Sequence, residues 1–123
     1  MMNKPSRHPP LIKFNSDGAF SPSRSNAAYG VIARDSRGDV VWWFSGRVVA
    51  SSALCIEAWA LRIACLAARD QGVVEAIFET DCKELVEYIL SHDADLVPWD
   101  IYAIVADIKP LARHHRWGFN YLV

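Results

Sequence analysis

Asp17, Glu57 and Asp81 are three acidic residues whose positions along the chain could create one shared site. Asp17 lies within or just after a strand-like run, Glu57 lies in the first turns of a helix-like run, and Asp81 ends a later strand-like run. The three carboxylates can meet if the two strands are neighbours in a mixed sheet and the helix packs over them. Carboxylates without a cationic partner repel one another, and a hard divalent cation such as Mg²⁺ relieves that repulsion because it prefers oxygen ligands. A pair of such ions about 4 Å apart can activate a water molecule and stabilise the leaving oxygen in phosphodiester hydrolysis.

Each of these acidic residues also has an explanation that needs no metal. Asp17 precedes Gly18, and Asp-Gly between strands is a typical turn signal. Asp81 can cap the helix that follows it, and Glu57 can lie at the solvent-facing edge of an apolar stripe. We favour the metal site because the three residues occur together in an order that suits it.

Other acidic residues are weaker candidates. Glu79 shares a strand face with Asp81, so it either supports the site or is a solvated charge at a strand edge. Asp93, Asp95 and Asp100 form a second acidic group before the last helical run. The preference of aspartate for turns and helix starts explains this group without a metal.

Basic and aromatic side chains indicate possible contacts with nucleic acid. The net charge is −1, so a strongly basic domain is excluded and any positive patch must be local. Trp42 and Trp43 could stack on bases, although adjacent strand residues face opposite ways and at least one should lie in the core. We interpret Trp99 and Trp117 as packing residues. Scattered surface arginines that could bind phosphates are Arg24, Arg34, Arg37 and Arg47.

The periodicity of apolar residues predicts the elements that position these side chains. Three strand-like runs joined by short polar turns predict an antiparallel meander, and the later strands require a crossover with parallel pairing. The expected order is β-β-β-α-β-α-α-β in a five-stranded mixed sheet. The strands are expected at 11–20, 27–35, 39–49, 73–80 and 116–123, and the helices at 51–72, 81–92 and 97–115.

Helix boundaries and faces follow from local signals. Ser51 or Ser52 can cap the first helix, Gly72 can end it, and Pro110 should kink or end the last one. The residues expected to face inward are Ile56, Trp59, Ala60, Ile63 and Ala67 in the first helix and Leu85, Tyr88 and Ile89 in the second.

The composition suits one intracellular, non-secreted domain. With 123 residues, 52% of them apolar, the chain can form a packed core. Residues 1–10 carry three prolines and no apolar stretch, so we expect a flexible leader and not a secretory signal, and no run is long enough to span a membrane. Cys55, Cys65 and Cys82 lack metal-ligand spacing and are expected to be free thiols in a reducing compartment.

The segments DGAFSPSRSNAAYGVIARDSRGDVV, SSALCIEAWALRIACLAA and IFETDCKELVEYI resemble the ribonuclease H family, and in particular its plant retroelement-derived branch. The resemblance covers roughly residues 11–123, with 40 residues from Asp17 to Glu57 and 24 from Glu57 to Asp81. It implies an α/β ribonuclease H-like fold, with helices on the faces of the sheet. It also implies a nuclease that cleaves the RNA strand of an RNA–DNA hybrid with two Mg²⁺ or Mn²⁺ ions. By this resemblance Asp17, Glu57 and Asp81 are the first three metal-binding carboxylates, and Asp17 contacts both ions.

Parts of the family pattern have no match here. The family's fourth carboxylate lies in a helix after the fifth strand, so we expect residues 11–123 to form a domain that lacks its final helix. His114 and His115 do not match the mobile histidine of many members. Ala53 and Leu54 replace polar residues that contact 2′-hydroxyl groups. The alternatives are a non-catalytic nucleic-acid-binding or interaction module, or a fragment without activity.

Overall fold

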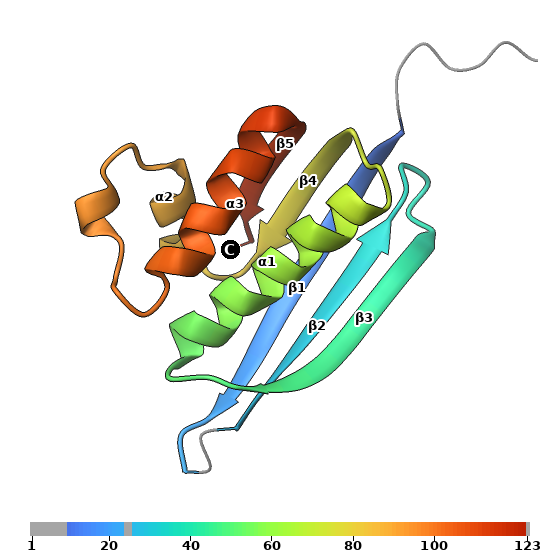
Figure 1. The fold of residues 1–123 in the computed structure, drawn as a ribbon. Coiled ribbons are helices and arrows are strands. Elements are labelled where there is room, and N and C mark those ends of the chain that lie inside the picture. Colours follow the sequence, from blue (N-terminus) through green and yellow to red (C-terminus); the bar gives the residue numbers. More distant parts are fainter. Residues whose placement is uncertain (1–9, 24–25, 123) are drawn as a thin grey trace, which may run out of the picture.

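The predicted order of strands and helices is confirmed by the computed structural model (Figure 1). The model describes residues 10–23 and 26–122, so the proposed leader lies almost wholly outside the described residues. A short 3₁₀ helix, η1 (Ala94–Leu96), adds one element to the expected order. The strands are β1 (Leu11–Ser21), β2 (Asn26–Arg34), β3 (Val40–Val49), β4 (Glu75–Thr80) and β5 (Arg116–Tyr121), and the helices are α1 (Ala53–Asp70), α2 (Lys83–Leu90) and α3 (Tyr102–His114).

The five strands form one mixed sheet in the order β3-β2-β1-β4-β5. β1, β2 and β3 pair antiparallel, whereas β4 pairs in parallel with both β1 and β5. The chain crosses from β3 to β4 through α1 and from β4 to β5 through α2 and α3, as parallel pairing requires. The mixed sheet expected from the sequence is therefore confirmed.

The described helices cover one face of the sheet rather than both. Along β1 the side chains of Ile12 and Phe14 are buried under α1, while those of Lys13 and Asn15 alternate onto the other face. Contacts of α1 with α2 and α3 place all three helices on the same side (Figure 1). We call the side of the sheet that carries Lys13 and Asn15 the open face. The resemblance implied helices on both faces of the sheet, and the described helices cover only one of them.

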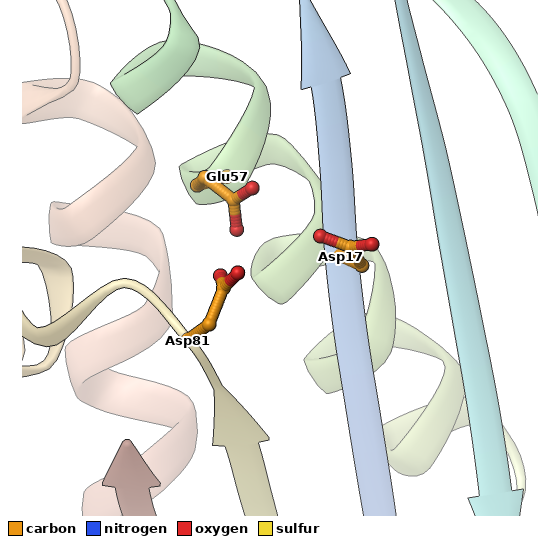
Figure 2. Close-up of side chains that lie close together, drawn as sticks. All are labelled: Asp17, Glu57 and Asp81. Atoms are coloured by element: carbon orange, nitrogen blue, oxygen red, sulfur yellow. The ribbon is translucent and has the colours of Figure 1, made fainter. Parts of the chain in front are cut away.

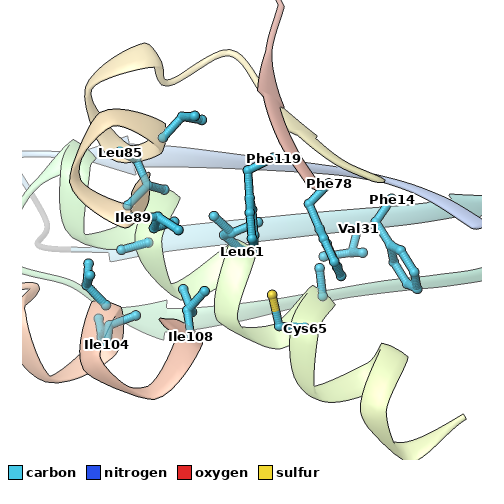
Figure 3. Packing of buried hydrophobic residues seen from close by; sticks show 14 of the residues in the cluster. Phe14, Val31, Leu61, Cys65, Phe78, Leu85, Ile89, Ile104, Ile108 and Phe119 are labelled. Atoms are coloured by element: carbon cyan, nitrogen blue, oxygen red, sulfur yellow. The ribbon is translucent and has the colours of Figure 1, made fainter. Parts of the chain in front are cut away.

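Aromatic rings join the strands to the helices in the core (Figure 3). Phe78 of β4 stacks between Phe14 of β1 at 5.0 Å and Phe119 of β5 at 5.3 Å, measured between ring centroids. Leu61 and Cys65 of α1 are fully buried against this layer. The aromatic layer therefore fixes the spacing of the strands that carry the acidic residues.

The buried stripe of α1 differs from the predicted one. Ile56 and Ala60 are buried as expected, but Trp59, Ile63 and Ala67 are only half-buried. The buried side chains of α1 are Cys55, Ile56, Ala58, Ala60, Leu61, Ala64, Cys65 and Ala68. The helix is rotated so that small residues meet the sheet, which lets its backbone lie close to β1 and β2. In α2, Leu85 and Ile89 are buried as predicted, whereas Tyr88 is half-buried.

Helix ends follow some of the predicted signals. The Ser52 hydroxyl accepts a hydrogen bond from the Cys55 amide at 3.0 Å and caps α1, and Gly72 follows the helix with a φ of 70°. Cys82, not Asp81, is the N-cap of α2. Pro110 lies inside α3, which continues to His114, so of the two predicted effects of this proline, a kink or an end of the helix, the end is wrong.

Three further predictions can be compared with the structure. Trp117 is buried, but Trp99 is 89% exposed, so its interpretation as a packing residue is wrong. Cys55 and Cys65 are buried free thiols, and Cys82 is a half-buried one. Among the described helices, none has the length and apolar character needed to span a membrane.

Candidate metal centre

The pairing of β1 with β4 brings Asp17 and Asp81 to the same level of the sheet. The parallel ladder between these strands ends at Asn15 and Glu79. Asp17 and Asp81 each lie two residues beyond that last pair, where the two strands separate. Crevices at the carboxyl ends of parallel strands are common ligand sites, because side chains from neighbouring strands converge there without a ladder between them. The two acidic residues therefore flank an opening at the end of the sheet.

Glu57 reaches this opening from the first turns of α1. Gly18 of β1 lies directly beneath the helix, and a Cβ atom at this position would lie 3.0 Å from Ile56 Cγ2 and 3.2 Å from Glu57 Oε1. The Gly18 amide donates hydrogen bonds to Glu57 Oε1 at 3.0 Å and to Asp17 Oδ1 at 2.9 Å. The Asp-Gly pair therefore lies inside a continuous strand and not in a turn. Gly18 is needed because the helix approaches the strand closely.

The three carboxylates gather into one group, which we call the carboxylate cluster: Asp17, Glu57 and Asp81. One oxygen from each lies within 4.8 Å of the others, and the side chains of Glu57 and Asp81 point toward each other (Figure 2). Asp17 and Asp81 are exposed, and Glu57 is half-buried. None of the ion pairs found within residues 10–23 and 26–122 involves the cluster. The mutual repulsion of the cluster is therefore not relieved by a side chain of the described chain.

The environment of Glu57 raises its pKa from the ordinary 4.5 to about 7. Burial is the largest cause, because it removes water from the charged form, and the nearby Asp81 charge adds to it. The hydrogen bond from the Gly18 amide acts in the opposite direction, since it favours the charged carboxylate. The part of this shift that comes from the Asp81 and Asp17 charges is the part that a positive charge among the three side chains would relieve.

Thr80 supports the cluster, and Glu79 does not. The buried Thr80 hydroxyl donates to Glu57 Oε2 at 3.4 Å and accepts a hydrogen bond from the Cys82 amide at 3.1 Å. Glu79 instead forms an ion pair with Lys13 at 3.3 Å on the open face. Thr80 was not predicted as a site residue from the sequence. The available signal was strand alternation, which places the residue before Asp81 on the face that α1 covers.

A hollow of about 560 Å³ opens beside the cluster on the open face. Its walls come from four strands and from the residues that follow β4 and β5. Trp43, which is 70% exposed, borders it, while Trp42 faces the other way and stacks on Phe14. The lining residues are Asn15, Ser16, Asp17, Gly30, Val31, Ile32, Trp43, Phe44, Ser45, Glu79, Thr80, Asp81 and Leu122. Space for a ligand of substantial size therefore adjoins the acidic side chains.

The donor set of the cluster fits a hard divalent cation. All three groups offer carboxylate oxygens, which Mg²⁺ and similar ions prefer over nitrogen and sulfur ligands. Two of the groups are exposed, so a cation that keeps several water ligands can enter. The third is held in place by a backbone amide and a buried hydroxyl, which limits the rearrangement needed on binding.

Comparisons with known proteins agree with this architecture. A family model described as reverse transcriptase-like matches residues 15–114. The N-terminal ribonuclease H domain of a Mycobacterium tuberculosis protein, solved as a fusion with maltose binding protein, has a TM-score of 0.81 at 17% identity, covering 92% of this chain and 82% of that one. Ribonuclease H1 from Halobacterium salinarum has a TM-score of 0.78 at 17% identity, covering 91% and 85%.

LC11 ribonuclease H1, solved in complex with an RNA/DNA hybrid, also has a TM-score of 0.78 at 17% identity, covering 90% of this chain and 84% of that one. No curated protein sequence matches this chain. At these identities the structural likeness establishes the fold, which is the ribonuclease H-like fold expected from the sequence.

Proposed function

This chain belongs to the reverse transcriptase-like family, and we propose that it hydrolyses the RNA strand of an RNA–DNA hybrid at the carboxylate cluster. The observation that carries the proposal is the convergence of three carboxylate oxygens within 4.8 Å, from two strands and a helix far apart in sequence. A structural neighbour with the same fold, LC11 ribonuclease H1, is in complex with an RNA/DNA hybrid. The proposed partner is therefore such a hybrid, or RNA, and the ribonuclease H-like fold positions the acidic side chains.

The cluster would hold Mg²⁺ or Mn²⁺ through Asp17, Glu57 and Asp81. A divalent cation bound there would supply positive charge for an attacking water and for the leaving oxygen of the phosphodiester. Asp17 adjoins both of the other contributing segments, because β1 pairs with β4 and packs under α1. The resemblance to the ribonuclease H family makes Asp17 the candidate for a ligand shared between two ions.

The remaining groups of the site hold the ligands in position. The Gly18 amide binds oxygens of both Asp17 and Glu57, so a single backbone group ties the strand ligand to the helix ligand. The Thr80 hydroxyl holds the second carboxylate oxygen of Glu57 by a hydrogen bond. Preorganised ligands of this kind favour catalysis because little reorganisation is needed during the reaction.

The proposal is tested by cleavage of a hybrid whose RNA strand carries a label, in buffers with Mg²⁺, Mn²⁺ or EDTA. We expect cleavage that depends on the metal, and a loss of about 100-fold or more in Asp17→Asn because a shared ligand is removed. Asp95→Asn is the matched control, since Asp95 is exposed and lies in the loop before α3, outside the cluster. Absence of cleavage by the native chain, or equal cleavage by Asp17→Asn, would reject the enzymatic proposal.

A second candidate function is a nucleic-acid-binding or interaction module that does not turn over substrate. The observation in its favour is that Ala53 and Leu54, in the first turn of α1 near Glu57, have no side-chain group that can bind a 2′-hydroxyl. The same assay separates the two functions. Hybrid binding by the native chain without metal-dependent cleavage would support this second candidate.

A further inference from the structure

The structure distinguishes among the arginines that could bind phosphate. Arg24 lies outside the described residues. Arg34 donates to the Gly38 carbonyl at 3.0 Å and pairs across the sheet with Lys13, four residues before Asp17. Arg37 lies in the turn after β2, at the same distant end. Arg47 is near the end of β3, at the end of the sheet where the carboxylate cluster lies.

Arg47 and Asp17 belong to neighbouring rows on the open face of the sheet. Asp17 pairs with Gly30, which pairs with Ser45, and the next row on the same face is formed by Ala19, Ala28 and Arg47. Glycine contacts confirm this assignment of faces, because a Cβ at Gly18 would meet α1 and one at Gly46 would meet Tyr29, both on the covered side.

The separation of the two side chains follows from sheet geometry. Arg47 is two residues along and two strands across from Asp17. With about 3.3 Å per residue and about 4.8 Å between strands, their Cα atoms lie about 12 Å apart. One strand of a duplex advances about 3.4 Å per nucleotide. When both side chains extend toward the substrate, the distance between them therefore spans no more than about three nucleotides.

The surface around Arg47 leaves room for a phosphate group. A hollow of about 350 Å³ lies between β1, β2 and β3, and its residues on the open face include the small Ala19 and Ala28. No acidic residue lines this hollow, and among the described residues no carboxylate forms an ion pair with Arg47, which is exposed. The guanidinium is therefore free to bind an anion through its planar set of donors.

We propose that Arg47 binds a backbone phosphate of the strand that is cleaved, within about three nucleotides of the phosphate held at the carboxylate cluster. This contact rests on the proposed function and extends it. The cluster repels the nucleic-acid backbone wherever no cation is bound, and the chain has a net charge of −1, so affinity must come from local cations. Arg47 supplies such a charge at the cluster end of the open face and sets the register of the strand across the site.

Binding measurements test the contact separately from cleavage. Fluorescence anisotropy with a labelled RNA–DNA hybrid is measured in Ca²⁺ over a range of salt concentrations, with the integrity of the RNA checked on a gel. We expect Arg47→Ala to weaken binding about tenfold and to lower the slope of log K against log salt by about one. Arg47→Lys should keep the slope, because it retains the charge, and recover part of the affinity.

Arg69→Ala is the matched control. Arg69 lies in the last turn of α1, twelve residues after Glu57, and forms an ion pair with Asp70. This variant should bind as the native chain does. If the native chain binds the hybrid and Arg47→Ala binds it with the same affinity and the same salt slope, the Arg47 contact alone is overturned. A native chain that does not bind the hybrid would overturn the proposed function and the contact with it.

Neutralised phosphates locate the contact on the strand. In a series of hybrids, one phosphate at a time in the RNA strand is replaced by an uncharged methylphosphonate. One substitution within about three nucleotides of the cleavage position should weaken native binding but leave Arg47→Ala unaffected. If every substitution weakens the native chain and the variant equally, the Arg47 contact is rejected.

Discussion

The chain contains two groups of three acidic side chains, and their surroundings differ. In the loop between α2 and α3, which we call the acidic loop, Asp93 accepts a hydrogen bond from the Asp95 amide at 3.0 Å. Asp100 accepts from the hydroxyls of Ser51 and Ser52, both at 3.3 Å. These bonds join the loop to the start of α1 and cap η1. The acidic loop therefore has a structural role, as the turn and helix-start preferences of aspartate predict.

The carboxylate cluster has the opposite character. Its members come from β1, α1 and the end of β4, and they face one another without a cationic side chain in the described parts of the chain. The donors that reach the cluster position its ligands but do not neutralise its charge. Convergence of uncompensated charge, and not the number of acidic residues, therefore marks a candidate metal site.

The largest expected effect that separates the two groups is stabilisation by metal. At a Mg²⁺ concentration about 100 times its Kd, the free energy of unfolding should rise by about 2.7 kcal/mol, because the ion binds only the folded chain. Glu57→Gln should lose most of this gain. Asp93→Asn, an acidic-loop variant whose side chain can still cap η1, should retain it. Chemical denaturation with and without Mg²⁺ measures the gain in unfolding free energy for both variants. An equal gain in Glu57→Gln and Asp93→Asn would show that the two acidic groups do not differ in metal binding.

The second prediction concerns the close approach of β1 and α1. Gly18→Ala should destabilise the chain by about 1–3 kcal/mol and weaken metal binding, because its Cβ would press on Ile56 and displace the Glu57 carboxylate. Gly118→Ala is the control, since no atom lies within 4 Å of its added Cβ. Denaturation midpoints measure the stability of the Gly18→Ala and Gly118→Ala variants, and a metal titration measures their affinity. Native-like affinity in Gly18→Ala would show that this contact does not position the ligand.

A smaller effect is expected in the acidic loop. Asp100→Ala removes the acceptor for two serine hydroxyls at the start of α1 and should cost about 1 kcal/mol of stability. Metal affinity should stay within about twofold of native, because Asp100 is not a member of the carboxylate cluster. Thermal unfolding and a Mn²⁺ titration test both parts. A large loss of metal affinity would mean that the two acidic groups are coupled.

The smallest expected effect is a pH dependence of stability without metal. The folded-state pKa of Glu57, about 7, exceeds its ordinary 4.5, so the stabilising contribution of the protonated form is complete below pH 4.5 and is lost as pH rises through 7. Glu57→Gln mimics the protonated group and should lack this component, so its stability relative to native should grow with pH. Exposure of half the side chain keeps the effect modest. Urea denaturation in EDTA from pH 5 to 8 measures it, and a constant difference would contradict the raised pKa.

Much of the fold could be predicted from the sequence because the strands and helices have strong, different periodicities. The alternation of apolar and polar residues along β1 predicts a strand, and the helical spacing of small and apolar residues in α1 predicts a helix. Patterns of this kind lead to the right order of strands and helices. The details that failed depend on tertiary contacts. The rotation of α1 is set by how its small residues fit against the sheet. Trp99 is exposed because Val97 and Ile101, on either side of it, make the core contacts of the segment before α3.

The candidate site was predictable in its members and not in its geometry. Asp17, Glu57 and Asp81 stand out by type and order, and the structure brings them together. The pairing of Asn15 with Glu79, which sets Asp17 and Asp81 at one level, is a long-range register that no local pattern encodes. The interaction of Gly18 with Glu57 likewise appears only when the helix is packed onto the strand.

Binding of Mn²⁺ shows whether the carboxylate cluster holds a divalent cation. Electron paramagnetic resonance of free Mn²⁺ is measured at pH 8, above the pKa of Glu57, for the native chain, Asp17→Asn and the acidic-loop control Asp95→Asn. If the cluster holds the ion, we expect saturable binding by the native chain and the control, and binding at least about tenfold weaker in Asp17→Asn. Identical binding curves for the native chain and Asp17→Asn would contradict this expectation.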